Sequence, residues 1–66
     1  MDELKKLQYE LDYAKGFLHS VMQKLNNQKF IHNAPQNVID IEIRKKEDAE
    51  AKINAIQERI ASMKNN

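Results

Sequence analysis

The sequence predicts an all-α fold, a two-helix antiparallel coiled coil that forms one helical hairpin. Apolar residues recur at alternating steps of three and four in both halves of the chain, which is the spacing of a coiled-coil seam. The one proline follows the segment 27–34 at the middle of the chain, where we expect the turn. When the halves are folded back on each other, small and large apolar residues alternate across the seam, as close packing requires.

The first helix is predicted over about residues 2–26. Its seam positions are Leu4, Leu7, Leu11, Ala14, Leu18, Val21 and Leu25. We expect the helix to stop at Asn26 and Asn27, because asparagine tolerates the left-handed backbone found just past helix ends.

The second helix is predicted over about residues 35–64. Proline is favoured at the first helical position, and Pro35 restricts Ala34 to an extended conformation. The apolar seam positions are Ile39, Ala49, Ile53, Ile56, Ile60 and Met63, and the residues expected to widen the apolar cover are Val38, Ile41 and Ile43. Glu42 and Lys46 fall in phase with the seam, and their spacing predicts an ion pair between them at a wide, fraying end.

The hairpin is expected to be a single domain over residues 1–66. The predicted seam pairs are Leu4 with Met63, Leu7 with Ile60, Leu11 with Ile56, Ala14 with Ile53 and Leu18 with Ala49. Because each seam is covered by the other half of the same chain, we expect a monomer or at most a weak dimer.

Charge is distributed unevenly along the chain. Residues 1–12 carry a net charge of −2, residues 13–46 carry +4 and residues 47–66 carry −1. No acidic residue occurs between Tyr13 and Ile39. In the predicted hairpin the positive charge therefore gathers at the turn end of a rod.

Aromatic residues mark the side of the first helix that faces away from the seam. Tyr9, Tyr13 and Phe17 are spaced by four, with Gly16 beside them. A glycine on a helix surface costs about 1 kcal/mol relative to alanine, so helix stability did not select it. Rings with interspersed lysines suit stacking on nucleotides. The same stripe could equally cover a protein partner or a second copy of the chain.

The turn segment NQKFIHNA holds Phe30 and Ile31, where a plain connector would hold glycine and polar residues. We expect Ile31 to cap the open end of the seam, which leaves Phe30, Lys29 and His32 for a partner. The alternative is that both apolar residues are buried caps.

Several kinds of chemistry are absent from the sequence. A single glycine cannot build a phosphate-binding loop, and no His, Cys or carboxylate pair has metal-ligand spacing. No apolar run approaches a membrane span, the start lacks a signal peptide, and the chain has no cysteine. We expect a cytoplasmic protein that is not an enzyme, holds no cofactor and binds no membrane.

The segment KLNNQKFIHNAPQNVIDIEIRKK, followed by AEAKINAIQERIASM, resembles the C-terminal arm of bacterial valyl-tRNA synthetase. The matching residues are Lys24, Leu25, Asn27, Phe30, Ile31, Ala34, Pro35, Val38, Ile39, Glu42 and the basic residues near Arg44. Ile43 departs from the family pattern, which often has a charged residue there. If the resemblance holds, the chain is a piece excised from the C-terminus of a larger synthetase.

The resemblance implies a coiled-coil arm that contacts the outer corner of tRNA, where the D and T loops meet. The parent enzyme would use ATP and Mg to join valine to tRNA, and the arm's partners would be tRNA and the rest of the synthetase. Basic side chains would attract phosphates, and aromatic ones would stack on nucleotides. The candidate tRNA-binding residues are Tyr13, Lys15, Gly16, Phe17, Lys24, Lys29, Phe30, His32, Arg44 and Lys45. The alternative is a helical hairpin that binds a protein or dimerises.

Overall fold

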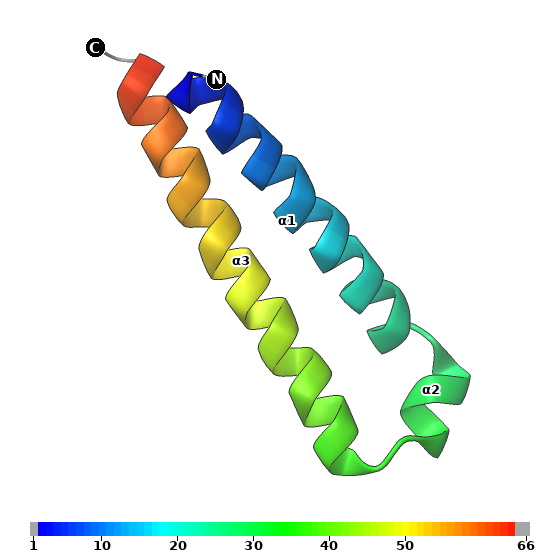
Figure 1. The fold of residues 1–66 in the computed structure, drawn as a ribbon. Coiled ribbons are helices and arrows are strands. Elements are labelled where there is room, and N and C mark those ends of the chain that lie inside the picture. The colour runs from blue at the N-terminus through cyan, green and yellow to red at the C-terminus, as the bar shows by residue number, and fades with distance from the viewer. Residues whose placement is uncertain (1, 65–66) are drawn as a thin grey trace.

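The computed structural model describes residues 2–64, which form three helices and no strand (Figure 1). The helices are α1 (Glu3–Leu25), α2 (Gln28–Asn33) and α3 (Gln36–Lys64). α1 and α3 run antiparallel, side by side, and α2 caps one end (Figure 1). The molecule is a rod of 49 × 16 × 15 Å. We call the α2 end the tip and the opposite end the base. The predicted helical hairpin is confirmed, and both long helices end within one residue of their predicted bounds.

The core is the seam between α1 and α3. Its buried apolar residues are Leu7, Ala14 and Val21 on α1 and Ala49, Ile53, Ile56 and Ile60 on α3. Leu7 packs with Ile56 and Ile60, and Leu4 and Leu11 cover this cluster, in agreement with the predicted pairing. Near the base the seam opens, because Met63, the predicted partner of Leu4, is 36% exposed.

α1 begins and ends at polar caps. Asp2 is the N-cap, and its carboxylate accepts a hydrogen bond of 2.8 Å from the backbone N–H of Lys5. At the other end Asn26 keeps a right-handed backbone (φ −89°, ψ −4°) and Asn27 is extended. No described residue has a positive φ. The expected left-handed stop is therefore wrong, because Asn27 instead opens the next helix.

The tip contains a short helix, α2, where the sequence predicted only a turn. The Asn27 side-chain oxygen accepts hydrogen bonds from the backbone N–H groups of Lys29 (2.9 Å) and Phe30 (3.3 Å). At the other end Ala34 is extended (φ −81°, ψ 143°), as predicted before proline, and its N–H donates to the Phe30 carbonyl. Six residues are too few to display a helical period in the sequence, so the pattern of apolar residues gave no sign of α2.

α3 begins one residue after Pro35, whose carbonyl accepts hydrogen bonds from the N–H groups of Val38 (3.0 Å) and Ile39 (3.2 Å). Val38 is half-buried, as expected. Ile41 and Ile43 are instead 53% and 40% exposed. They flank a seam position at about 100° on either side, so their predicted contribution to the apolar cover is wrong. None of the helices within residues 2–64 has the length and apolar character needed to span a bilayer.

Candidate nucleic-acid interface

A buried carboxylate joins the two long helices in the tip half of the rod. Glu42 on α3 is 5% exposed and occupies the seam. Its Oε2 accepts a hydrogen bond of 3.1 Å from Lys45 Nζ, and its Oε1 lies 3.7 Å from Lys24 Nζ on α1. We call these three residues the Glu42 cluster. The predicted ion pair between Glu42 and Lys46 is wrong, because the Glu42 side chain turns toward α1 and Lys46 pairs with Glu50 at 3.8 Å.

The two lysines keep Glu42 ionised. The hydrogen bond from Lys45 lowers the pKa of the Glu42 carboxyl, burial opposes this by raising it, and the positive charges of Lys24 and Lys45 lower it further. The Lys24 contact is too long for a hydrogen bond, and Glu42 Oε1 accepts none from the described residues. Two ammonium groups share one carboxylate, so the Glu42 cluster has a net positive charge.

The outward face of α1 is open, as the sequence predicted. Tyr9 and Tyr13 are each 71% exposed, and Phe17 is 42% exposed. A Cβ atom built on Gly16 would meet nothing within 4 Å, so another molecule could approach the backbone closely there. The Ser20 hydroxyl donates a hydrogen bond to the Gly16 carbonyl.

A groove between α1 and α3 brings part of the candidate site together. It has a volume of about 300 Å³ and is lined by Tyr13, Ala14, Phe17, Lys45, Asp48, Ala49 and Lys52. We call it the waist groove. A shallower hollow beside it is lined by Asp12, Tyr13, Gly16, Phe17 and Ser20. Three predicted residues of the first helix thus share a surface with Lys45 of the second.

Two charged residues of the waist groove, Asp48 and Lys52, were missed by the sequence analysis. They lie in the segment 47–66, which carries a net negative charge and was therefore not predicted to bind RNA. A signal was nevertheless present. Lys45, Ala49 and Lys52 follow steps of four and three, which places both lysines and the small residue on one side of a helix.

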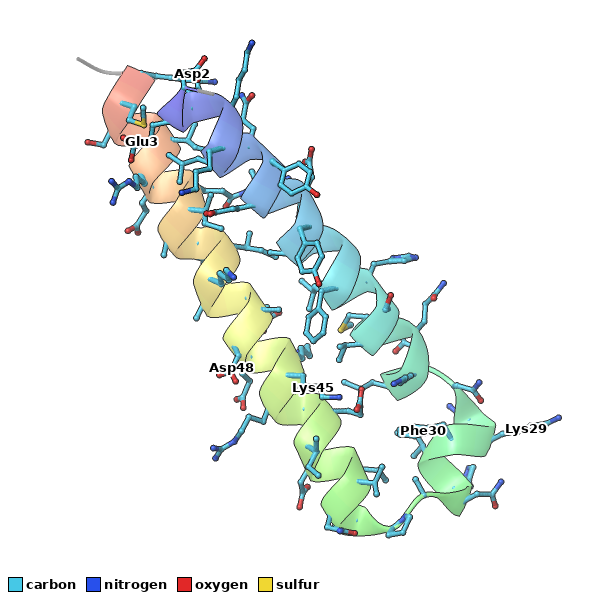
Figure 2. All side chains as sticks on the ribbon, in the orientation of Figure 1. Asp2, Glu3, Lys29, Phe30, Lys45 and Asp48 are labelled. Atoms are coloured by element: carbon cyan, nitrogen blue, oxygen red, sulfur yellow. The ribbon has the colours of Figure 1, made fainter. Side chains whose placement is uncertain are left out.

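The tip carries three of the predicted residues. Lys29 and His32 are exposed on α2, whereas Phe30 and Ile31 are half-buried. Figure 2 shows Lys29 pointing away from the rod and Phe30 turned inward. This arrangement favours the alternative in which both apolar residues cap the seam, although part of Phe30 stays accessible. Lys15 and Arg44 are also exposed, form no ion pair within residues 2–64 and line neither hollow.

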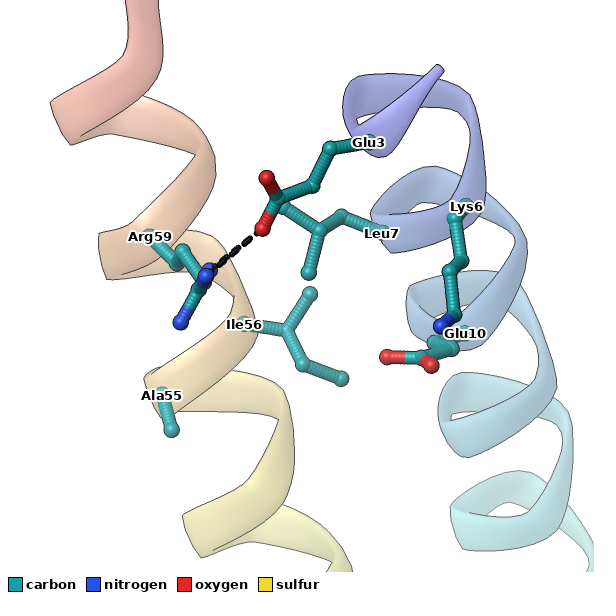
Figure 3. A pocket seen from close by; sticks show the side chains of 7 residues that line it. All are labelled: Glu3, Lys6, Leu7, Glu10, Ala55, Ile56 and Arg59. Atoms are coloured by element: carbon teal, nitrogen blue, oxygen red, sulfur yellow. Dashed lines mark hydrogen bonds and ion pairs between the residues drawn. The ribbon is translucent and has the colours of Figure 1, made fainter. Parts of the chain in front are cut away.

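A hollow larger than the waist groove lies at the base (Figure 3) and suits a polyanion poorly. It has a volume of about 730 Å³ and is lined by Glu3, Lys6, Leu7, Glu10, Ala55, Ile56 and Arg59. Arg59 is already paired with Glu3, its Nη2 lying 2.6 Å from Glu3 Oε1 (Figure 3). Two carboxylates would repel phosphates here. The described residues also hold no group of three potential metal ligands.

Comparison with known proteins agrees with the resemblance. The family model described as the valyl tRNA synthetase tRNA binding arm matches residues 1–64. The valine–tRNA ligase of Phocaeicola vulgatus is 52% identical over 63 residues, 96% of this chain and 7% of that protein. That of Parabacteroides distasonis is 55% identical over 62 residues, 94% of this chain and 7% of that protein. The Bacillus subtilis ligase is 40% identical over 63 residues, 96% of this chain and 7% of that protein.

The chain therefore spans about 7% of the length of these relatives. No solved structure is detectably similar to it. The family match over nearly all residues, on a helical hairpin whose basic half carries exposed aromatic rings, leads to one conclusion. The chain belongs to the family of valyl-tRNA synthetase tRNA-binding arms.

Proposed function

We propose that this chain is the arm by which a valine–tRNA ligase holds the outer corner of tRNA, where the D and T loops meet. The observation that carries the proposal is the agreement between the family and the charge distribution. The acid-free stretch from Tyr13 to Ile39 covers the distal half of α1, all of α2 and the start of α3. A phosphate backbone meeting the tip half of the rod would thus encounter lysines with few opposing carboxylates.

Recognition in this proposal is by shape and charge. Phosphate contacts fix the position of a nucleic acid but carry no sequence information, and the same outer corner occurs in every tRNA. The choice of valine and of the correct tRNA then belongs to other parts of the parent ligase. The arm itself performs no chemistry and needs no cofactor, since ATP and Mg act in the catalytic domain of the parent. As one domain of a larger cytoplasmic synthetase, it raises the effective concentration of tRNA near that domain.

Charge reversal at the tip half tests the proposal. The test variant carries Lys29→Glu and Arg44→Glu, both at exposed positions without an ion pair among residues 2–64. The control variant carries Lys5→Glu and Lys64→Glu, an identical change in charge at the base. We expect the test variant to bind an unmodified tRNA transcript at least about tenfold more weakly, with a flatter dependence of affinity on salt. The control should retain its affinity.

Helicity measured by circular dichroism should be the same in both variants, which excludes unfolding as the cause. In an NMR titration with the same tRNA, shifts should cluster on residues 13–46 and shrink as salt is raised. Equal loss of affinity in the two variants, or none in either, would contradict the proposal.

A second candidate function is a helical hairpin that binds a protein or dimerises through its aromatic face. The observation in its favour is that Tyr9 and Tyr13, one helical turn apart, are each 71% exposed, because contiguous exposed apolar surface can mark a protein-interaction site. Sedimentation equilibrium distinguishes the two functions. A mass that rises with protein concentration, together with a tRNA affinity that the charge reversal leaves unchanged, would support the second candidate.

A further inference from the structure

We propose that the waist groove binds one unpaired nucleotide of the RNA, with the base against Tyr13 and Phe17 and the phosphate at Lys45 and Lys52. This inference rests on the proposed function, because it names the part of the RNA that one region of the arm would hold. It adds Lys52, Asp48, Ala14 and Ala49 to the interface, and it extends the contact from the tip to the middle of the rod.

Two small seam residues, one from each long helix, line the groove. Ala14 on α1 and Ala49 on α3 are 4% and 6% exposed, and both line the groove. Their side chains are too short to fill the space between the flanks of the helices. The resulting volume of about 300 Å³ lies at the lower end of the roughly 300–1,000 Å³ typical of small-ligand sites. It suits a single nucleotide rather than a helix of a protein partner.

One wall of the groove is aromatic. Tyr13 and Phe17 stand one helical turn apart on α1, and both line the groove while remaining 71% and 42% exposed. Exposed rings in this arrangement offer a stacking surface for any base, because every base has a π-face. A base in a duplex is already stacked between its neighbours, so this wall selects unpaired nucleotides.

The opposite wall is charged, and its net charge is positive. Lys45 and Lys52 line the groove together with one acid, Asp48. The hydrogen bond of 3.1 Å to Glu42 Oε2 ties the Lys45 ammonium at the end of the groove nearer the tip, whereas Lys52 forms no ion pair within residues 2–64. Figure 2 shows Lys45 on the side of α3 that faces α1 and Asp48 on its outer flank. A phosphate can therefore reach the lysines while the carboxylate stays at the rim, where it can accept a hydrogen bond from a base amino group.

Two tyrosines of the same helix provide a matched test. Tyr9 and Tyr13 have the same exposure and lie one turn apart, but only Tyr13 lines the groove. We expect Tyr13→Ala to weaken binding of an unmodified tRNA transcript about tenfold, as the loss of one stacked base does. Tyr9→Ala should change the affinity by less than about twofold on the same scale. A blunt RNA duplex without unpaired nucleotides should bind both variants and the unaltered chain equally.

Lysine substitutions test the phosphate contact independently of stacking. Lys52→Gln removes a positive charge at the groove, and Lys64→Gln removes one at the base. The slope of log affinity against log salt should fall by about 0.7–0.9 in Lys52→Gln, the amount expected for one lost phosphate contact. It should stay unchanged in Lys64→Gln. Both side chains are exposed, so neither change should alter helicity.

The outcomes separate this inference from the proposed function. If Tyr9→Ala and Tyr13→Ala act alike while the reversal of Lys29 and Arg44 still weakens tRNA binding, the arm function stands and the groove site is overturned. If tRNA does not bind the unaltered chain at all, both fall. If Tyr13→Ala lowers the mass of a self-associated species and leaves tRNA affinity intact, the groove is a contact between copies of the chain, which also overturns the nucleotide site.

Discussion

Glu42 places a charged side chain at a buried position of the seam. It is the only buried charged residue in the part of the chain that the structure describes. Removing a carboxylate from water is unfavourable, but the lowered pKa of Glu42 means that the two lysines more than offset this penalty for the ionised form. Most seam positions hold apolar residues, so a coiled coil designed for stability alone would place leucine here. The position therefore links the stability of the seam to the arrangement of the lysines.

Replacing this carboxylate should stabilise the hairpin. We expect Glu42→Leu to raise the midpoint of thermal unfolding by roughly 4 °C or more, because a leucine at this buried position adds apolar burial that exceeds the contribution of the lysine pairs. Lys45→Ala should lower the midpoint, since it leaves the buried carboxylate without its hydrogen bond. Circular dichroism melts provide the measurement, with Glu47→Leu as the control, because Glu47 is exposed and forms no ion pair among residues 2–64. A lower midpoint in Glu42→Leu would mean that the lysine pairs stabilise the hairpin more than a buried leucine does.

The stability of the hairpin should also depend on pH through Glu42. Its pKa in the folded chain is lowered from the ordinary value of 4.5, with the Lys45 hydrogen bond as the largest cause. A lowered pKa means that the ionised carboxylate adds stability above pH 4.5 and that this contribution is lost as the pH falls through the folded-state value. Urea unfolding at several pH values should show this loss in the unaltered chain. The difference in the free energy of unfolding between the unaltered chain and Glu42→Gln should change over that pH range and become constant below it. A difference that does not depend on pH would contradict the prediction.

Periodicity predicted where Glu42 lies but not which lysine it contacts. The seam phase places position 42 toward α1, but the sequence predicted a fraying end there, whereas the structure buries Glu42. The choice among Lys24, Lys45 and Lys46 depends on side-chain rotamers and on the position of the facing helix, which a spacing rule for one isolated helix does not contain. Lys52 was missed for the same reason, because the waist groove that it lines is formed by residues of two different helices.

Among the elements, the two long helices could be predicted and the short one could not. Seven seam positions in α1 and the matching positions in α3 repeat often enough to define a phase, and tertiary packing then stabilises the helices. α2 has no such repeat. It depends on the side chain of Asn27, whose two hydrogen bonds satisfy backbone N–H groups at its first turn.

Removing the cap should therefore open α2 and leave α1 and α3 intact. We expect Asn27→Ala to destabilise the tip by about 1 kcal/mol, the usual effect of losing an N-cap. Amide hydrogen exchange at Lys29 and Phe30 should accelerate, while amides in the middle of α1 keep their protection. Asn26→Ala is a suitable control, since no side-chain hydrogen bond of Asn26 is present among the described residues. Uniform acceleration along the chain would indicate a loss of global stability instead.

At the scale of the whole molecule, stability and binding should respond differently to salt. The core is an apolar seam, and the ion pairs near the surface, such as Arg59 with Glu3, have exposed side chains. Exposed pairs of this kind contribute about 0–1 kcal/mol each. Raising the salt concentration should thus shift the thermal midpoint little, while tRNA affinity falls steeply. Parallel melts and binding titrations over the same salt series would check this. A midpoint that falls in step with affinity would show that the ion pairs maintain the fold.

The shape of the rod has a mechanical consequence. α1 begins and α3 ends at the base, and α2 lies at the far end of a body three times longer than it is wide (Figure 1). Such a body acts as a lever: a slight rotation at the base carries the tip through an arc several ångströms long, while the seam keeps the two helices moving as one. In the proposed complex the tip can therefore follow a moving RNA corner without any change in the packing of the hairpin.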